Sequence, residues 1–312
     1  MTMVGPYGAY GDFAFKACAE HGTHYLDCTG EVPFVARMIK KYEDTAKSTG
    51  ALMFPQIGVD SAPPDLVAWS LATLNRSELN ADTRDVTVSV LLKYVGPEDA
   101  VKTGLTPSSA APSGGTLATV FTLFDNFTMK EVKASHVPFA LSPMPHEQPV
   151  SARRSFLSRL TGLVRVPKLG LLTTSLSGGT DAPIVQRTWG LLPVNPSRKG
   201  QFYGPNFTFR EFTPTPNWLR GMAQHFALTL FGLLLIAPPL RRLAWRFVHQ
   251  PGQGPDREAA KKDRVEYRGV GAPDLESTGG KQAFCRAHFQ GSMYYRKSHW
   301  SVPVRYFLLT WR

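Results

Sequence analysis

Cysteine is scarce in this chain. Its three cysteines, Cys18, Cys28 and Cys285, form neither an even disulfide framework nor a metal-type spacing. A reduced, intracellular compartment fits this usage best, and the opening residues do not resemble a secretory signal peptide. The sequence also lacks a nucleophile elbow and any Ser/His/Asp constellation that its spacing can support. These absences argue against a disulfide-stapled secreted protein, a metal-dependent enzyme and a serine-type hydrolase.

Acidic residues become scarce in the second half. Residues 1–150 hold 11 Lys/Arg and 16 Asp/Glu, whereas residues 151–312 hold 24 and 8, within a net charge of +11. This asymmetry predicts that the second half faces something anionic, either a membrane surface or nucleic acid. A merely solvated basic face is the alternative. Because no motif interleaves aromatic and basic residues in the way nucleic-acid binders do, we expect no nucleic-acid partner.

The first 80 residues alternate between helix-like and strand-like runs. Helical periodicity covers about 12–20, 33–49 and 64–74, and short strand-like stretches lie between these runs. This alternation is typical of a parallel α/β sheet, whose ligands bind at the carboxyl ends of the strands. Polar residues fall where these strands should end: Asp27, Thr29, Glu31, Asp60 and Ser61.

The rest of the chain, from residue 81 to about 295, is predicted to form an α+β domain. Residues 75–85 are polar and indicate a linker before an alternating strand at 86–92. Further strands are expected near 169–176, 203–212, 265–270 and 283–290. Residues 296–312 have no helical period and are expected to form an irregular tail.

Three blocks carry a resemblance to a known family. "GPYGAYG", "ACAEHGTHYLDCTGE" and "GVDSAPPDL" resemble the saccharopine dehydrogenase-like oxidoreductases, which include trans-acting enoyl reductases of lipid synthesis. The resemblance runs from residue 4 to about residue 295. It implies a partial Rossmann-type parallel sheet in residues 1–80, followed by the α+β substrate domain. The family normally opens with a strand, G-x-G-x-x-G and a helix; this chain has no such opening, so we expect it to be truncated at both ends.

The resemblance also suggests cofactor-binding residues. It places Gly5, Pro6 and Tyr7 on the loop beside the nicotinamide of NADP or NAD. The glycines of this loop are spaced three and three, which is not the dinucleotide fingerprint, so we expect this chain to bind the cofactor weakly. Asp27 is a candidate contact to ribose or substrate, although a turn or capping role explains an aspartate there equally well.

Two polar segments are candidates for substrate binding. Asp60 and Ser61 follow a predicted strand, but they can equally be the capping pair of the next helix. A glycine-rich helix start can hold an anionic or carbonyl group at its N-terminus, or can serve packing alone. Its residues are Ser113, Gly114, Gly115 and Thr116. The sequence does not identify catalytic residues.

An uncharged run extends from Phe226 to Leu240, and a basic amphipathic segment follows it. Fifteen helical residues cover about 22 Å, short of the roughly 30 Å hydrocarbon core, and Pro238-Pro239 interrupts the run. We therefore predict that residues 226–248 form a hydrophobic hairpin that anchors the protein without crossing the membrane. A buried core helix is the alternative. The predicted membrane-contacting residues are Phe226, Phe231, Leu234, Ile236, Arg241, Arg242, Trp245 and Arg246.

Together these patterns predict an α/β protein related to NAD(P)-dependent oxidoreductases of lipid or glycolipid metabolism. Its expected partners are a lipid-like substrate and an intracellular membrane or lipid-droplet surface, with homodimer formation left open. The competing hypothesis is a non-catalytic membrane or lipid-droplet protein that kept the fold without binding the cofactor.

Overall fold

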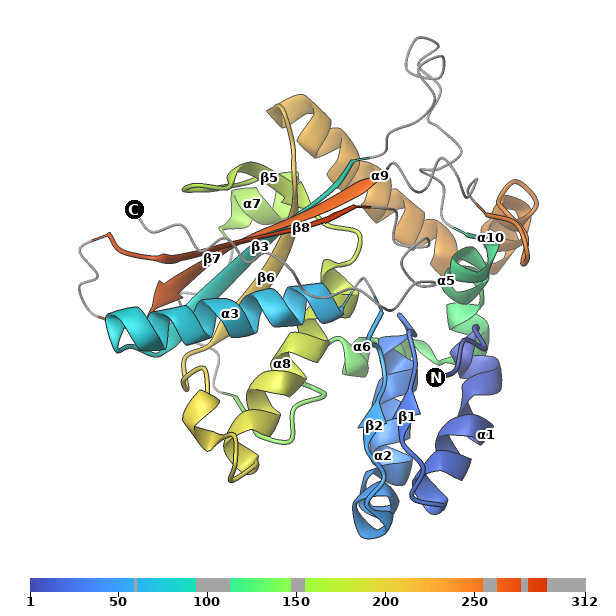
Figure 1. Cartoon of the computed structure of the whole chain (residues 1–312). Coiled ribbons are helices and arrows are strands. Elements are labelled where there is room, and N and C mark those ends of the chain that lie inside the picture. Colours follow the sequence, from blue (N-terminus) through green and yellow to red (C-terminus); the bar gives the residue numbers. More distant parts are fainter. Residues whose placement is uncertain (59–60, 94–112, 147–154, 255–262, 276–279, 291–312) are drawn as a thin grey trace.

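The computed structural model describes residues 1–58, 61–93, 113–146, 155–254, 263–275 and 280–290 (Figure 1). The first elements are α1 (Tyr7–Glu20), β1 (Tyr25–Leu26), α2 (Val32–Thr49), β2 (Met53–Phe54), α3 (Ala62–Leu79) and β3 (Thr83–Lys93). The middle of the chain contains α5 (Gly114–Asn126), α6 (Met129–Ser135), α7 (Phe156–Thr161), β4 (Val164–Val166), β5 (Gly170–Thr174) and α8 (Gly178–Val194). The last elements are η3 (Lys199–Gln201), β6 (Thr208–Pro214), α9 (Trp218–Ile236), α10 (Pro238–Trp245), β7 (Arg264–Pro273) and β8 (Ala283–Gln290).

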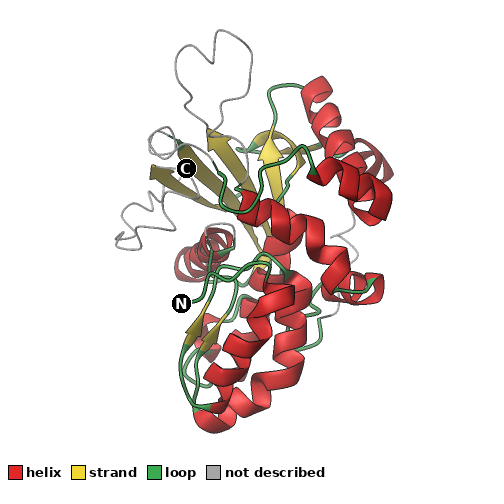
Figure 2. Cartoon of the chain, turned by 90° about the vertical axis from the view of Figure 1, so that its right-hand side faces the viewer, coloured by secondary structure: helices red, strands yellow, loops and turns green. Residues whose placement is uncertain are grey.

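A small parallel sheet pairs β1 with β2, beside α1 and α2 (Figures 1 and 2). Its core joins apolar side chains of α1, β1 and α2, among them Phe15, Tyr25 and Met38. Helix α2 has a proline in its first turn, where the missing N–H costs nothing, and ends at Gly50 in a left-handed conformation. The predicted helix–strand alternation of the opening segment is therefore present.

Helix α1 begins at Tyr7, five residues before the predicted start at Asp12. The sequence suggested a glycine-rich loop there, but Gly8 and Gly11 lie inside the helix. Aromatic rings pack against both: a Cβ atom would lie 2.6 Å from the Phe127 ring at position 8 and 2.7 Å from the Phe34 ring at position 11. Close packing therefore accounts for these two glycines.

The large sheet has six strands in the order β4-β5-β6-β3-β7-β8. Only β3 and β6 run parallel; the other neighbouring strands are antiparallel, so this sheet is mixed. Helices α3 and α8 join its core, with Leu71, Val88, Trp189, Phe207 and Tyr267 among the buried residues. The architecture is thus the expected mixture of α and β structure.

Helix α3 extends to Leu79, beyond the predicted end at residue 74 and into the predicted linker. The Asn75 side chain, which is fully buried, donates a hydrogen bond to the Thr83 hydroxyl at 3.0 Å, and Asn80 ends the helix with φ +48°. Because α3 packs on the large sheet, the core connects the segment 1–80 with the segment that follows it.

Helices α9 and α10 meet at Ala237, where Pro238 and Pro239 occupy the first turn of α10. The N-terminal half of α9 is tied to β5: Thr173 Oγ1 donates to the Gly221 carbonyl at 2.7 Å, and Gln224 Nε2 donates to the Thr174 carbonyl at 3.0 Å. Among the described residues, α9 alone is long and apolar enough to cross a membrane, and 11% of its 18-residue apolar window is buried. The predicted tail at 296–312 lies outside the described residues.

Candidate functional site

Asp27 follows β1 directly and is completely buried. Its Oδ1 atom accepts hydrogen bonds from the backbone N–H groups of Thr29 (3.0 Å) and Gln56 (2.7 Å), and its Oδ2 atom accepts from the Tyr25 hydroxyl (2.6 Å). Burial raises the pKa of this carboxyl, and the hydrogen bonds oppose part of that rise. In this structure Asp27 joins the loops that follow β1 and β2; its contact to ribose or substrate stays a prediction.

Glu31 directly precedes α2, and its carboxylate lies at the N-terminal end of α1. Its Oε1 atom accepts from the Tyr7 backbone N–H at 2.6 Å, and its Oε2 atom accepts from the Gly8 backbone N–H at 2.8 Å. Burial raises the pKa of Glu31, against the effect of these two hydrogen bonds. Exposed N–H groups at a helix N-terminus attract phosphates and carboxylates. Here a carboxylate of the protein itself takes two of them.

The loop residues Gly5, Pro6 and Tyr7 differ in exposure. Gly5 is exposed, Pro6 is half-buried and Tyr7 is buried. The Tyr7 hydroxyl donates a hydrogen bond to the Thr2 carbonyl at 2.9 Å and lies 3.6 Å from Cys28 Sγ. Burial raises the pKa of Tyr7 well above its ordinary value. A Cβ atom on Gly5 would lie 3.3 Å from the Thr119 hydroxyl, so this loop lies against α5.

Gln56 is a buried polar residue that the sequence pattern did not single out. Its φ of +59° is uncommon for a residue other than glycine, and such strain concentrates at functional sites. Gln56 Nε2 donates to Ser61 Oγ (3.1 Å) and to the Thr180 carbonyl (2.8 Å), and Ser61 Oγ donates to Asp181 Oδ1 (2.9 Å). Gln56 therefore links the small sheet to the start of α8.

This network brings Asp27 and Ser61 together through Gln56, and Tyr7 reaches the same loop through Cys28. The predicted partner Asp60 lies outside the described residues. A common cleft lined by these segments therefore stays a prediction. No signal in the local sequence distinguishes Gln56, because a positive φ at glutamine cannot be inferred from composition or periodicity.

Ser113, Gly114, Gly115 and Thr116 form the start of α5, as expected. Ser113 Oγ accepts from the Thr116 backbone N–H at 3.3 Å and caps the helix. Gly114 N–H donates to the Gln253 carbonyl at 2.8 Å, and a Cβ atom on Gly114 would overlap the Gln250 carbonyl. The segment after α10 thus lies on this helix start, which gives Gly114 a packing role; the substrate-binding role stays a prediction.

The eight predicted membrane residues fall into different environments. Phe226, Ile236, Arg242 and Arg246 are exposed, whereas Phe231, Leu234 and Trp245 are half-buried. Phe231 and Trp245 both pack against the buried ring of Phe121 in α5, at centroid distances of 6.1 and 5.4 Å. Arg241 is buried and paired with Asp125.

Comparison with known proteins adds an independent observation. No family model matches the chain, and no solved structure shows a significant match. A Mycobacterium tuberculosis protein named "Putative trans-acting enoyl reductase" is 28% identical over 280 residues, which cover 86% of this chain and 61% of that protein. A "Trans-acting enoyl reductase" of Mycobacterium bovis is 44% identical over 71 residues, 23% of this chain and 17% of that protein.

An Arabidopsis thaliana protein named "Probable mitochondrial saccharopine dehydrogenase-like oxidoreductase" is 42% identical over 66 residues, 21% of this chain and 14% of that protein. The chain spans 61% of the length of the Mycobacterium tuberculosis protein. The resemblance inferred from the sequence blocks is thus confirmed at modest identity. The chain has homologues that are named as trans-acting enoyl reductases and as a saccharopine dehydrogenase-like oxidoreductase.

Proposed function

We propose that the protein is an NAD(P)-dependent oxidoreductase that acts on a lipid-like substrate, with reduction of an enoyl double bond as the favoured reaction. The observation that carries this proposal is the similarity to a trans-acting enoyl reductase over 86% of the chain. A nicotinamide cofactor, when bound, supplies the hydride, and the protein's contribution is to position the reactants. Such an enzyme needs no metal or nucleophilic side chain.

Polar groups near the expected cofactor position are already hydrogen-bonded within the protein. Two N–H groups at the start of α1 are bonded to Glu31, and both carboxylate oxygens of Asp27 are bonded within the protein. Gly5 is the exposed part of the loop that the family resemblance assigns to the nicotinamide. We therefore expect weak binding of the cofactor by this 312-residue chain.

The second part of the proposal is attachment to an intracellular membrane or lipid-droplet surface through α9 and α10. Apolar side chains at spacings of three and four residues lie exposed along α9: Leu219, Ala223, Phe226, Leu230 and Leu233. Residues 212–255 include Arg220, Arg241, Arg242 and Arg246 and no acidic residue. Arg241 is buried and paired with Asp125, whereas the other three arginines are exposed. An apolar helix face next to exposed arginines suits an anionic lipid surface.

The bonds between α9 and β5 favour a helix that lies on the surface rather than one that crosses. The helix has 19 residues, about 28 Å, so its length alone no longer argues against crossing. However, Gly221 and Gln224 are hydrogen-bonded to β5, and crossing would carry that part of the sheet into the hydrocarbon or break these bonds. An attached helix with one exposed face supports monotopic binding.

A hydride-transfer assay tests the enzymatic proposal. The protein is incubated with millimolar NADPH or NADH that carries deuterium at the transferable position, a long-chain enoyl thioester and anionic vesicles. Mass spectrometry is expected to find one deuterium in the reduced acyl chain. Heat-denatured protein is the control. Folded, vesicle-bound protein that transfers no deuterium from either cofactor would contradict the oxidoreductase proposal.

The bonds made by Glu31 favour one alternative, a non-catalytic membrane protein that kept the fold. In that case the carboxylate at α1 has replaced an external anion permanently. The same assay separates the two functions, because the alternative expects vesicle binding without hydride transfer.

A further inference from the structure

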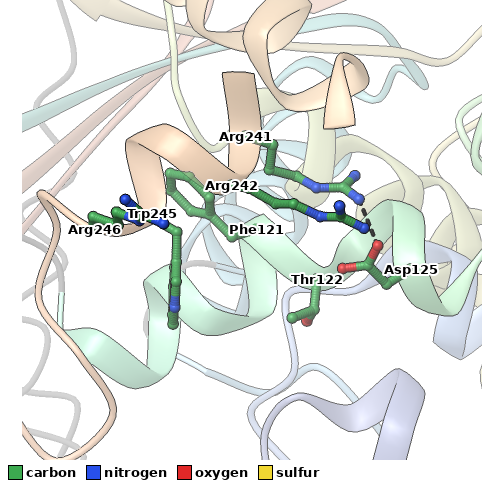
Figure 3. Close-up of a pocket in the computed structure, with 7 residues that line it drawn as sticks. All are labelled: Phe121, Thr122, Asp125, Arg241, Arg242, Trp245 and Arg246. Atoms are coloured by element: carbon green, nitrogen blue, oxygen red, sulfur yellow. Dashed lines mark hydrogen bonds and ion pairs between the residues drawn. The ribbon is translucent and has the colours of Figure 1, made fainter. Parts of the chain in front are cut away.

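A pocket of about 340 Å³ lies between α5 and α10 (Figure 3). Its size is near the lower end of small-molecule sites, roughly 300–1,000 Å³. The rings of Phe121 and Trp245, 5.4 Å apart between centroids, supply its apolar part. The complete lining is Phe121, Thr122, Asp125, Arg241, Arg242, Trp245 and Arg246.

Arg241 is the fixed cation of this pocket. Only 7% of the residue is exposed; its Nη2 atom pairs with the Asp125 carboxylate, and its Nη1 atom donates to the Leu235 carbonyl at 3.2 Å. A buried guanidinium requires such partners because its charge is costly to remove from water. Arg241 therefore holds α10 to α5, and Asp125 balances its charge.

Arg242 and Arg246 are not balanced in this way. Both are exposed, and neither has an acidic partner within the described part of the chain. Arg242 lies beside Arg241 in the sequence, and Figure 3 shows both side chains pointing toward the end of α5 that carries Asp125. In the same view the Arg246 side chain lies at the other end of the pocket, beyond Phe121 and Trp245. The Asp125 end therefore holds two guanidinium groups against one carboxylate, and Arg246 adds a further positive charge to the lining.

Nearby sequence does not relieve this excess, since residues 212–255 contain no Asp or Glu. Arginine charges persist at all physiological pH values, so the repulsion between them cannot be removed by loss of a proton. A concave site with such a charge concentrates anions. An anionic ligand that enters the pocket would replace repulsion by attraction.

We propose that this pocket binds a phosphate ester. The planar guanidinium fork matches the oxygens of a phosphate group, and the unpaired Arg242 lies beside the Arg241–Asp125 pair, where it can contact a phosphate. Phe121 and Trp245 then contact the apolar part of the same molecule. A phospholipid headgroup and a soluble phosphate ester present this group in the same way. The site depends on the arginine geometry and not on the oxidoreductase proposal.

Two kinds of probe test the site in the full 312-residue protein. Isothermal titration calorimetry measures binding of inorganic phosphate and glycerol 3-phosphate. Co-sedimentation measures binding to vesicles of phosphatidylglycerol with phosphatidylcholine, and to vesicles of phosphatidylcholine alone. We expect saturable binding of the soluble esters, or a preference for the phosphatidylglycerol vesicles. The variant Arg242→Gln/Arg246→Gln should weaken that binding by about tenfold or more, as expected when the hydrogen bonds from one charged group are lost.

The matched control is Arg198→Gln/Lys199→Gln, which removes two exposed charges between α8 and β6. Circular dichroism confirms folding of both variants; neither change touches the Arg241–Asp125 pair.

Tight binding of glycerol 3-phosphate identifies a soluble ligand. Preference for phosphatidylglycerol vesicles that millimolar glycerol 3-phosphate does not abolish identifies a headgroup. The proposal is overturned if no phosphate probe binds, or if the Arg242/Arg246 variant loses no more binding than the control. If both variants bind vesicles of phosphatidylcholine alone equally well, membrane attachment through α9 does not depend on this pocket.

Discussion

Glycine has opposite consequences at positions 11 and 232. Both lie inside helices, where alanine is ordinarily favoured by about 1 kcal/mol. At Gly11 a Cβ atom would meet the Phe34 ring in a packed core, whereas nothing lies within 4 Å of a Cβ atom at Gly232. Overpacking costs typically about 1–3 kcal/mol. Gly11→Ala should therefore lower the free energy of unfolding, and Gly232→Ala should raise it. Chemical denaturation measures both changes. Changes of the same sign would contradict the packing described at these two positions.

Asp65 makes stability depend on pH. Burial raises the pKa of its carboxyl to about 7, even though the Thr188 hydroxyl donates a hydrogen bond to it at 2.8 Å. The Oδ1 atom is buried and has no hydrogen-bond partner in the described part of the chain. The folded protein thus retains a proton that the unfolded chain loses above its ordinary pKa of 3.8. The stability that this proton provides is complete below that value and is lost as pH rises through about 7.

The variant Asp65→Asn should remove this dependence. At pH 8 the wild-type protein pays up to about 4 kcal/mol for the buried charge, and asparagine keeps the hydrogen bond to Thr188 without ionising. The measurement is the unfolding midpoint of both proteins at pH 5 and pH 8. The wild-type midpoint should fall more between these pH values than the midpoint of the variant; equal falls would mean that Asp65 ionises freely in the folded state.

Residues whose role depends on their neighbours in space were the hardest to predict from the sequence. Asp27 was found because it follows a strand, where polar residues gather at a sheet edge. Gln56 was missed because its positive φ and its contacts with Ser61 and Thr180 arise from tertiary structure. Glu31 was noted only as a polar residue, since nothing local indicates that it folds back onto α1.

At the scale of elements, α9 provides the test of membrane attachment. Leu230 and Leu233 are 68% and 59% exposed, so replacing them should leave the fold intact. Each leucine gains about 1.5–3 kcal/mol when it leaves water, so Leu230→Gln/Leu233→Gln should weaken vesicle binding by about a hundredfold or more. The matched control is Leu52→Gln/Leu66→Gln, which alters two exposed leucines outside α9. Vesicle binding that falls equally in both variants, measured by co-sedimentation, would reject α9 as the anchor.

Element types were easier to predict than element ends. Periodicity predicted α2, and alternation predicted β3, close to their observed bounds. The start of α1 was missed because three glycines normally indicate a loop, and here the aromatic rings of Phe34 and Phe127 require two of them inside the helix. The six-stranded order could not be predicted, because the pairings join segments far apart in the sequence.

At the scale of the whole molecule, cofactor affinity is the sharpest expectation. The backbone N–H groups of Tyr7 and Gly8 and the Asp27 carboxylate are already hydrogen-bonded within the protein. We therefore predict that NADPH binds this chain with a dissociation constant well above the micromolar range. Fluorescence titration measures this affinity, with heat-denatured protein as the control. A low-micromolar constant would show that the chain forms a complete site.

Strand β3 lies at the centre of the large sheet, between β6 and β7. During translation at about 5–20 residues per second, roughly 10–40 s pass between synthesis of β3 and synthesis of β7. Both edges of a valine-rich strand thus leave the ribosome without their final partners, a condition that favours aggregation or chaperone binding. A nascent chain arrested before residue 264 should remain protease-sensitive at β3, and the released full-length chain should be protected. Strong protection in the arrested chain would mean that β3 finds substitute partners before β7 exists.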